Sequence, residues 1–189
     1  MVKKYEKIKY IIKKIKVIFI DIDGVLSDGV MIYSEAGYEM KNFHVRDGVG
    51  IRLAQEAGLR IVFITAEQLQ LIKNRAKKLN VKDLYMGVKN KVRFIKEFVD
   101  KNSLVMEEIA FIGDDINDIP ALETVGLPIA VGDSVNEAKE IVNKRNGIIT
   151  ENLGGKGAVR EAVEIILKAK GIWEKVLEED INAHKSAGF

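Results

Sequence analysis

From Val17 onward, short apolar runs alternate with amphipathic stretches along the chain. This alternation is typical of parallel β-strands joined by crossover helices. Strands are expected at Val17–Ile20, Arg60–Thr65, Asp83–Met86, Ile109–Ile112, Pro128–Val131 and Ile148–Thr150. Helices are expected near Gly50–Ala57, Gln68–Leu79, Lys91–Lys101, Ile119–Val125, Val135–Asn143 and Val159–Lys168. Because the connections are short, the pattern predicts a single doubly wound α/β domain over residues 1–189.

The segment from Gly29 to Val45 interrupts the alternation. It consists of two extended pieces around Glu35-Ala36-Gly37, and Gly37 can supply the positive φ of a tight turn. We therefore expect a β-hairpin, at about residues 29–45, inserted after the first strand. It is too small to close over a site by itself, so the chain is expected to lack a large cap domain.

The two ends of the chain carry further helical patterns. Near the start, isoleucines recur at helical spacing at Ile8, Ile11, Ile12 and Ile15. They predict an amphipathic helix, within residues 1–16, that packs on the domain; binding to a membrane surface is the alternative. The apolar run that follows is too short to span a bilayer. Residues 156–189 are expected to form one helix and then a polar tail from Glu178.

Charge and cysteine content restrict the possible partners. Thirty Lys and Arg residues against 28 Asp and Glu leave a net charge of +2, which does not indicate a nucleic-acid-binding protein. The chain has no cysteine, which excludes disulfides, thiolate zinc sites and cysteine nucleophiles. Oxygen-ligated hard metals remain, and neither nucleic acid nor a membrane is expected as a partner. The expected location is the cytoplasm.

Carboxylates follow two of the predicted strands. Asp21 and Asp23 come after the first strand, and Gly113-Asp114-Asp115-Ile116-Asn117-Asp118 follows Ile109–Ile112. In an open α/β sheet, ligands bind at the carboxyl ends of the strands. Repulsion between clustered carboxylates is relieved by a cation, so the pattern predicts a site for a hard dication. For Asp21 and Asp23 alone, a strand end with solvated acids is the alternative, and Asp118 can also cap the helix that begins near Ile119.

Two further residues complete a set suited to phosphoryl transfer. Thr65 ends another predicted strand, the second in chain order, and Lys91 opens a helix. In sequence order, the set offers a nucleophile, a proton donor, a hydroxyl for a phosphate oxygen, a cation and metal ligands. Taken singly, Thr65 is an ordinary strand-end residue and Lys91 an ordinary solvated lysine, and Lys89 is the alternative lysine for the phosphate.

These residues resemble the four motifs of the haloacid dehalogenase-type phosphatases: Asp21-Ile22-Asp23-Gly24, Thr65, Lys91 and Gly113 to Asp118. The resemblance covers most of the chain and implies a Rossmann-like core. It implies that Asp21 attacks phosphorus, and that Asp23 protonates the leaving oxygen and then activates water. It also implies Mg²⁺ held by the Asp21 carboxylate, the Asp23 carbonyl and the Asp114 carboxylate. Asn117 and Asp118 are expected to orient Lys91 and the loop, and Asp115 is expected beside the metal ligands.

Additional segments resemble the 3-deoxy-D-manno-octulosonate 8-phosphate phosphatases in particular. They are Asp21 to Gly29, His44 to Gly48, Arg75-Ala76-Lys77, Gly87 to Lys91 and Gly155 to Glu161. This resemblance implies a small phosphorylated sugar acid as substrate, from lipopolysaccharide biosynthesis. It also implies a homotetramer in which the hairpins form a central barrel and neighbouring subunits cover each other's sites. An open monomer acting on bulky substrates is the alternative.

The predicted substrate contacts leave the exact sugar open. His44, Val45, Arg46, Asp47 and Gly48 resemble a substrate loop, and Arg75 is a further contact. The octulosonate enzymes commonly have Thr-Gly-Arg after the second strand, where this chain has Thr65-Ala66-Glu67. A glutamate repels the carboxylate that an arginine would bind, so Glu67 favours nononate 9-phosphates as alternative substrates.

Two other classes of protein use similar residues. A receiver-like phospho-acceptor domain also gathers aspartates, a threonine and a lysine around Mg²⁺ on a doubly wound sheet. It places its acceptor at the third strand, however, and here a second acidic group lies late in the chain. A catalytically inactive sugar-phosphate-binding module is the third alternative, although every chemical group for turnover is present.

Overall fold

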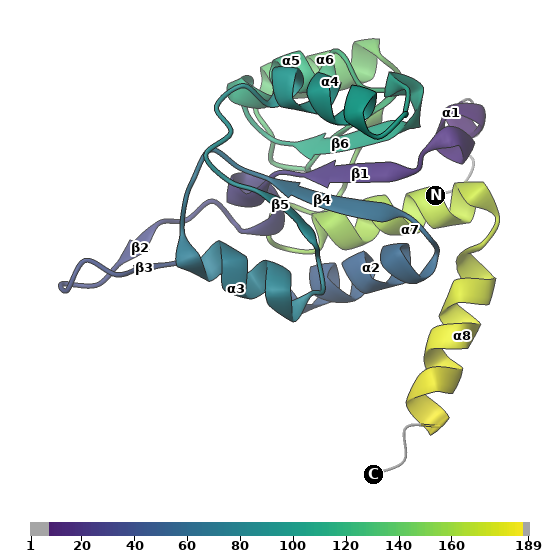
Figure 1. Cartoon of the computed structure of the whole chain (residues 1–189), viewed down its shortest axis with the longest axis horizontal. Helices are drawn as coiled ribbons and strands as arrows, with labels where there is room; N and C mark the ends of the chain where they lie inside the picture. The colour runs from purple at the N-terminus through teal and green to yellow at the C-terminus, as the bar shows by residue number, and fades with distance from the viewer. Residues whose placement is uncertain (1–7, 187–189) are drawn as a thin grey trace.

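A parallel β-sheet forms the centre of the molecule. In this computed structural model, which describes residues 8–186, six strands lie in the order β5-β4-β1-β6-β7-β8. Figure 1 labels β5, β4, β1 and β6 between the two layers of helices. They are β1 (Val17–Ile20), β4 (Arg60–Ile64), β5 (Asp83–Tyr85), β6 (Ile109–Gly113), β7 (Leu127–Ala130) and β8 (Ile148–Ile149). All of their pairings are parallel. The predicted doubly wound α/β fold is confirmed, and the ends of each predicted strand are right to within one residue.

Helices cover both faces of the sheet (Figure 1). One face carries α2 (Val45–Glu56), α3 (Gln70–Lys78) and α7 (Ala158–Lys170), and the other carries α4 (Lys91–Lys101), α5 (Ile119–Leu122) and α6 (Asn136–Lys144). Side chains alternate between two cores, because successive strand residues point to opposite faces. In β1, Ile18 and Ile20 enter one core, whereas Val17 and Phe19 enter the other, where the Phe19 ring meets that of Phe98 at 5.1 Å.

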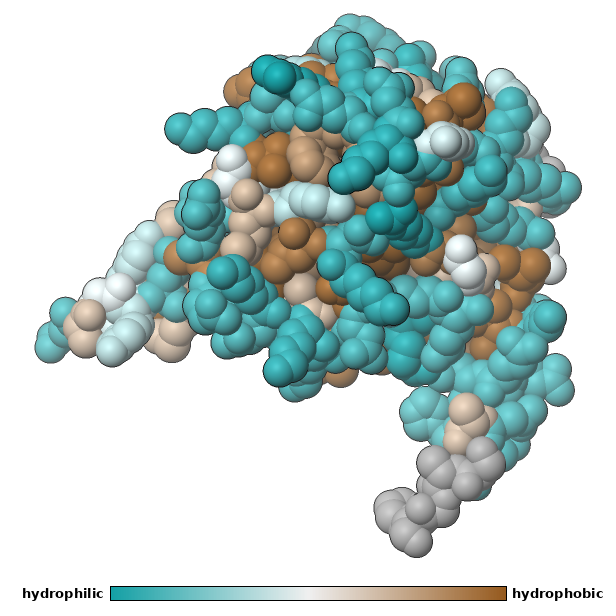
Figure 2. Space-filling view, viewed as in Figure 1, coloured by the Kyte–Doolittle hydropathy of each residue, from teal (hydrophilic) through white to brown (hydrophobic). Residues whose placement is uncertain are grey.

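The hairpin predicted after the first strand is confirmed. Strands β2 (Ile32–Tyr33) and β3 (Glu39–Met40) are antiparallel, and Gly37 has a φ of +80° in the turn between them. The hairpin projects from the body of the molecule (Figure 1) and shows pale and light brown residues on its surface (Figure 2). Its large exposed apolar side chains are Val30, Met31, Tyr33, Tyr38 and Met40.

Helix α2 begins five residues earlier than predicted. It starts at Val45 rather than Gly50, so Arg46 lies in a helical turn and not in a loop. Glycine is unfavourable within helices, yet Gly48 and Gly50 both lie inside α2. At Gly50, however, a Cβ atom would lie only 2.9 Å from Cα of Arg160 in α7. The glycine thus permits a close crossing of two helices, and this packing outweighs its poor helix propensity.

The ends of the described chain are helical. Helix α1 (Lys9–Lys14) buries Ile12, as expected, while residues 1–7 of the predicted helix lie outside the described residues. The prediction of a single C-terminal helix was wrong, because a second helix, α8 (Trp173–Ser186), follows α7. Gly171, with a φ of +75°, ends α7, and an ion pair between Arg52 and Asp180 ties α8 to α2. Across residues 8–186, no helix is both long and apolar enough to cross a bilayer.

Candidate active site

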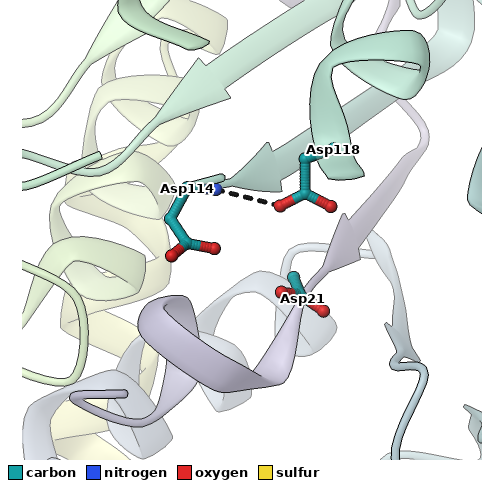
Figure 3. A group of neighbouring side chains, drawn as sticks. All are labelled: Asp21, Asp114 and Asp118. Carbon is teal, nitrogen blue, oxygen red and sulfur yellow. Dashed lines mark hydrogen bonds between the residues drawn. The ribbon is translucent and has the colours of Figure 1, made fainter. Parts of the chain in front are cut away.

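Three carboxylates converge at the carboxyl end of the sheet. Strands β1 and β6 are neighbours, with Ile20 beside Ile112, so the residues that follow them leave the sheet at the same level. One carboxylate oxygen from each of Asp21, Asp114 and Asp118 lies within 4.8 Å of the others. Figure 3 shows these three side chains gathered in one place. The cluster therefore lies at the edge where open α/β sheets bind their ligands.

Glycines let the backbone approach this cluster closely. Gly24 has a φ of +81°, and a Cβ atom there would lie 2.1 Å from Oδ2 of Asp114. A Cβ atom on Gly154, in the segment before α7, would lie 1.7 Å from the carbonyl oxygen of Gly24. The segment at Gly154 thus packs directly on the loop that follows β1, and neither position can accept a side chain without a shift of its neighbours.

The electrostatics of the cluster favour a bound cation. Burial, followed by the charge of Asp118, raises the pKa of Asp21 from 3.8 to about 7, although Lys91 opposes the shift. Burial, followed by the charges of Asp21 and Asp118, raises the pKa of Asp114 from 3.8 to about 8. Carboxylates that repel each other in this way suit a hard divalent cation, which prefers oxygen ligands. The residues present therefore fit a magnesium site.

Asp118 is occupied by other partners. Its Oδ1 accepts a hydrogen bond from Lys91 Nζ at 2.6 Å, and its Oδ2 accepts one from the Asp114 backbone N–H at 3.0 Å. Figure 3 shows this second bond, which joins Asp114, at the start of the loop after β6, to Asp118 in the same loop. Asp118 therefore positions Lys91 and Asp114, and the carboxylates of Asp21 and Asp114 are better placed to hold an ion.

Lys91 is buried at the first position of α4, behind the N-cap residue Asn90. Its Nζ lies 2.8 Å from Oδ1 of Asp21 as well as 2.6 Å from Oδ1 of Asp118. Burial favours the neutral amine, but the two carboxylates outweigh it and raise the pKa of Lys91, which stays charged. The alternative lysine, Lys89, is exposed. Lys91 is thus the lysine that reaches Asp21.

Thr65 is buried at the end of β4, directly beside β1. Its Oγ1 accepts a hydrogen bond from the backbone N–H of Glu67 at 3.0 Å, which leaves the hydroxyl proton for another acceptor. The Glu67 side chain is exposed in the loop before α3. The two residues therefore lie at the same carboxyl edge of the sheet as the acidic cluster.

Asp115 and Asn117 do not join Asp118 in the interior. Both are exposed, and Oδ1 of Asp115 accepts a hydrogen bond from the backbone N–H of Ile116 at 2.6 Å. Asp115 thereby caps the short 3₁₀ turn Ile116–Asp118 that presents Asp118. Of Asn117 and Asp118, the two residues predicted to orient Lys91, Asp118 is the one that the structure places against it.

The Asp23 side chain contacts the hairpin. Its Oδ1 lies 2.7 Å from Nζ of Lys41, and the same Nζ lies 2.7 Å from Oε1 of Glu39. Lys41 is not among the residues predicted from the sequence. The available indication was weak: Glu39 and Lys41, at a spacing of two, share one face of the predicted second hairpin strand.

The residues predicted as a substrate loop are divided between structural and exposed positions. Asp47 is fully buried and accepts hydrogen bonds from the backbone N–H groups of Gly157, at 3.2 Å, and Arg160, at 2.8 Å. Burial raises the pKa of Asp47, and those two N–H groups partly offset the shift. Asp47 therefore joins α2 to α7, and its carboxylate is not presented to a substrate.

Arg75 also supports the backbone of this segment. Its Nη2 donates a hydrogen bond to the carbonyl of His44 at 3.2 Å, and its guanidinium lies over the Phe43 ring at 5.2 Å. Gly48 is buried beside Arg75, since a Cβ atom there would lie 3.2 Å from Nη2. The exposed side chains of the segment are those of Val45 and Arg46, and Arg46 lines a pocket of about 540 Å³.

Several known proteins are similar to this chain. Residues 87–153 match a family model described as haloacid dehalogenase-like hydrolase. The 3-deoxy-D-manno-octulosonate 8-phosphate phosphatase KdsC of Escherichia coli K12 is 37% identical over 159 residues, which are 84% of this chain and 82% of that protein. The chain belongs to this phosphatase family. The corresponding Yersinia pestis enzyme is 36% identical over 156 residues, which are 82% of this chain and 81% of that enzyme.

Solved structures of the phosphatase family share the fold. The Moraxella catarrhalis octulosonate 8-phosphate phosphatase, in complex with a magnesium ion, a phosphate ion and the sugar acid KDO, superimposes with a TM-score of 0.87. It is 32% identical, and the match covers 92% of this chain and 97% of that one. The cobalt-bound Haemophilus influenzae enzyme has a TM-score of 0.80 and 32% identity, over 86% of this chain and 93% of its own. Family membership identifies this chain as a phosphatase and argues against a receiver-like domain.

Proposed function

We propose that the chain is a Mg²⁺-dependent phosphomonoester hydrolase that removes the phosphate of 3-deoxy-D-manno-octulosonate 8-phosphate. The observation that carries the proposal is the approach of Lys91 Nζ to within 2.8 Å of Asp21, beside Asp114, at the carboxyl end of the sheet. The similarity to octulosonate 8-phosphate phosphatases over 84% of the chain supports the choice of substrate.

The carboxylates of Asp21 and Asp114, with the backbone carbonyl of Asp23, would hold the metal. When bound, Mg²⁺ supplies the positive charge that lets a phosphate dianion approach these acids. Lys91 contributes a second positive charge, and the Thr65 hydroxyl is placed to donate a hydrogen bond to a phosphate oxygen. Phosphoryl transfer depends mainly on such positioning and charge neutralisation, so this set of groups is suited to binding and orienting the phosphate for the first step.

In the first step, a carboxylate oxygen of Asp21 forms a bond to phosphorus while the bond between phosphorus and the sugar oxygen breaks. Asp23, as a carboxylic acid, gives its proton to that oxygen, which leaves as the sugar hydroxyl. The products of this step are an acyl phosphate on Asp21 and an ionised Asp23. Lys91 remains beside the Asp21 oxygen and stabilises the negative charge on the transferring group.

In the second step, water attacks the phosphorus of the aspartyl phosphate. The Asp23 carboxylate takes a proton from this water, so the acid of the first step becomes the base of the second. The bond between phosphorus and Asp21 breaks and releases inorganic phosphate. Both side chains then return to their starting protonation states.

A second candidate substrate class is the nononate 9-phosphates. Glu67 is exposed in the loop after Thr65, at a position where an arginine would bind a sugar-acid carboxylate. A glutamate there accepts hydrogen bonds from hydroxyl groups or an ammonium group instead. This one residue favours the nine-carbon substrates, whereas the similarity of the chain as a whole favours the eight-carbon substrate.

We further infer that the protein acts as a homotetramer assembled through its hairpins. Tyr33 and Tyr38, on the hairpin, are 59% and 73% exposed, and Met40 beside them is 51% exposed. Apolar side chains gathered on a projecting element are typical of an interaction surface. Neighbouring subunits would then supply the cover that the small hairpin cannot give its own site.

The deciding experiment measures phosphate release in the presence of Mg²⁺, with octulosonate 8-phosphate and nononate 9-phosphates as substrates. A higher kcat/KM for the eight-carbon substrate supports the proposal, and a higher kcat/KM for a nine-carbon substrate assigns specificity to Glu67. Asp21→Asn should abolish turnover and keep the fold, and Asp100→Asn, at an exposed position on α4, is the matched control. Turnover by Asp21→Asn at the wild-type rate would exclude the aspartyl-phosphate route.

A further inference from the structure

A buried lysine from the hairpin reaches the residue proposed as acid and base. The side chain of Lys41 is only 3% exposed, although the hairpin itself projects into solvent. Its Nζ lies 2.7 Å from Oδ1 of Asp23 and 2.7 Å from Oε1 of Glu39. A buried ammonium group is stable only with such partners. The contact between Lys41 and Asp23 therefore holds these two side chains more firmly than an exposed ion pair would.

The backbone around Lys41 is fixed to the catalytic loop. Phe43 forms an antiparallel bridge with Ser27, and Asn42 Nδ2 donates a hydrogen bond to Oδ2 of Asp28 at 3.0 Å. Both anchor points lie within a few residues of Asp23. Because side chains alternate along an extended chain, Glu39 and Lys41 share one face, and Met40 points to the other. Glu39 and Lys41 thus lie on the side of this segment that meets Asp23, and the exposed Met40 lies on the opposite side.

The contact with Lys41 leaves one oxygen of Asp23 available. Oδ1 is buried against the ammonium group, whereas the Asp23 side chain as a whole is 35% exposed. The exposure therefore belongs to the remainder of the carboxyl group, including Oδ2. Without Lys41, the carboxyl group could turn about its side-chain torsions toward solvent, since sp³–sp² torsions of this kind are broad.

We propose that Lys41 is a positioning residue for Asp23. By holding Oδ1, it directs Oδ2 toward the oxygen that leaves from phosphorus. The inference rests on the proposed function, because it assigns Lys41 a part in the proton transfer by Asp23. It gives the hairpin a role within its own subunit that is separate from any role of its exposed apolar side chains.

The role can be isolated by comparing leaving groups. The value of kcat/KM reports events up to the first irreversible step, which is cleavage of the bond between phosphorus and the leaving oxygen. A sugar hydroxyl must be protonated as it leaves, whereas p-nitrophenolate is stable without a proton. Since general acid catalysis contributes about 10²–10⁴-fold, we expect Lys41→Met to lower kcat/KM for the sugar phosphate about 100-fold. The same variant should lower kcat/KM for p-nitrophenyl phosphate only a few-fold.

Matched variants separate positioning from packing. Lys41→Arg keeps a cation and should retain most of the ratio of the two kcat/KM values. Lys101→Met removes an exposed lysine at the end of α4 and should leave both values unchanged. In an Asp23→Ala background, Lys41→Met should cause no further selective loss, because there is no carboxyl group left to position. Lys41→Gln, which keeps a polar group in the buried position, replaces Lys41→Met if the methionine variant does not fold.

The possible outcomes distinguish this inference from the proposed function. Equal losses of kcat/KM on both substrates, in a folded Lys41 variant of wild-type size in solution, would assign Lys41 a purely structural role and overturn the inference. A selective loss that persists in the Asp23→Ala background would also overturn it. A wild-type protein that hydrolyses neither substrate would instead refute the proposed function. A selective loss that depends on Asp23 supports the inference.

Discussion

Asp114 should make the metal-free protein less stable, because its charge is buried among other acids. In the unfolded chain this carboxyl group has a pKa near 3.8, and in the folded protein burial, followed by the charges of Asp21 and Asp118, raises the pKa to about 8. The perturbation that tests this cost is Asp114→Asn, which keeps the shape of the side chain and removes its charge. We expect this variant to be more stable than the wild type in the presence of a chelator.

The sign and size of the effect follow from the two pKa values. Between pH 4 and 8, the folded protein retains a proton that the unfolded chain has released, so the free energy of unfolding falls as pH rises. The fall is at most about 1.4 kcal/mol per pH unit, or about 5 kcal/mol at about pH 7.5. Water at this half-buried carboxyl group screens much of that cost, so we expect a gain of about 2 kcal/mol for Asp114→Asn. For a chain of this size, this corresponds to an increase in Tm of about 4–8 °C.

Thermal unfolding in chelator, at about pH 5.5 and about pH 7.5, measures the effect. The gain in Tm for Asp114→Asn should be large at the higher pH and small at the lower one, and Asp100→Asn, exposed on α4, should show neither. Added Mg²⁺ should stabilise the wild type more than Asp114→Asn, because the variant lacks a charged ligand. A gain that is the same at both pH values, or a loss of stability in chelator, would refute the electrostatic reasoning.

Three further changes test other parts of the site. Lys91→Met should abolish phosphate release and lower the free energy of unfolding in urea by about 3 kcal/mol, because it leaves buried carboxylates without their shared cation; wild-type stability would contradict this. Gly154→Ala should lower the free energy of unfolding by about 2 kcal/mol and weaken Mg²⁺ binding measured by calorimetry, since its Cβ would lie 1.7 Å from the Gly24 carbonyl oxygen. An unchanged affinity for Mg²⁺ would show that the packing of Gly154 on the loop after β1 does not affect the metal site. Tyr38→Glu should reduce the mass measured by light scattering from a tetramer to a smaller species, and an unchanged mass would exclude the hairpin as the interface.

The strands of the sheet could be predicted because each one is marked by a pattern in consecutive residues. A strand buried by helices on both faces needs a run of apolar residues, and β6 carries such a run from Ile109 to Ile112. Once the strands are known to be parallel, their carboxyl ends must meet at one edge, which brings Asp21 and Asp114 together without knowledge of any side-chain contact. The family resemblance adds the roles of these residues, but their proximity follows from strand direction alone.

Contacts between distant segments explain what could not be predicted. The start of α2 at Val45 was missed, and the reason that glycine suits Gly50 within this helix is Arg160, more than one hundred positions along the chain. Asp47 resembles part of a substrate loop, yet its carboxylate accepts backbone hydrogen bonds at the start of α7. Lys41 is one lysine among many in the sequence, and only the return of the hairpin to the loop at Asp23 distinguishes it. Each of these depends on how the ends of two elements pack, which local patterns do not specify.

The charges of the site also suggest an order of binding. When ionised, Asp21, Asp114 and Asp118 carry three negative charges, and Lys91 carries one positive charge, so the cluster has a net charge of −2. A phosphate dianion that entered this cluster would meet repulsion in a largely buried, low-dielectric environment. A divalent cation held by Asp21 and Asp114 brings the net charge of the cluster, Lys91 included, to zero and so removes this net repulsion. The carboxylates that destabilise the metal-free protein are therefore the groups that make metal binding a condition for substrate binding.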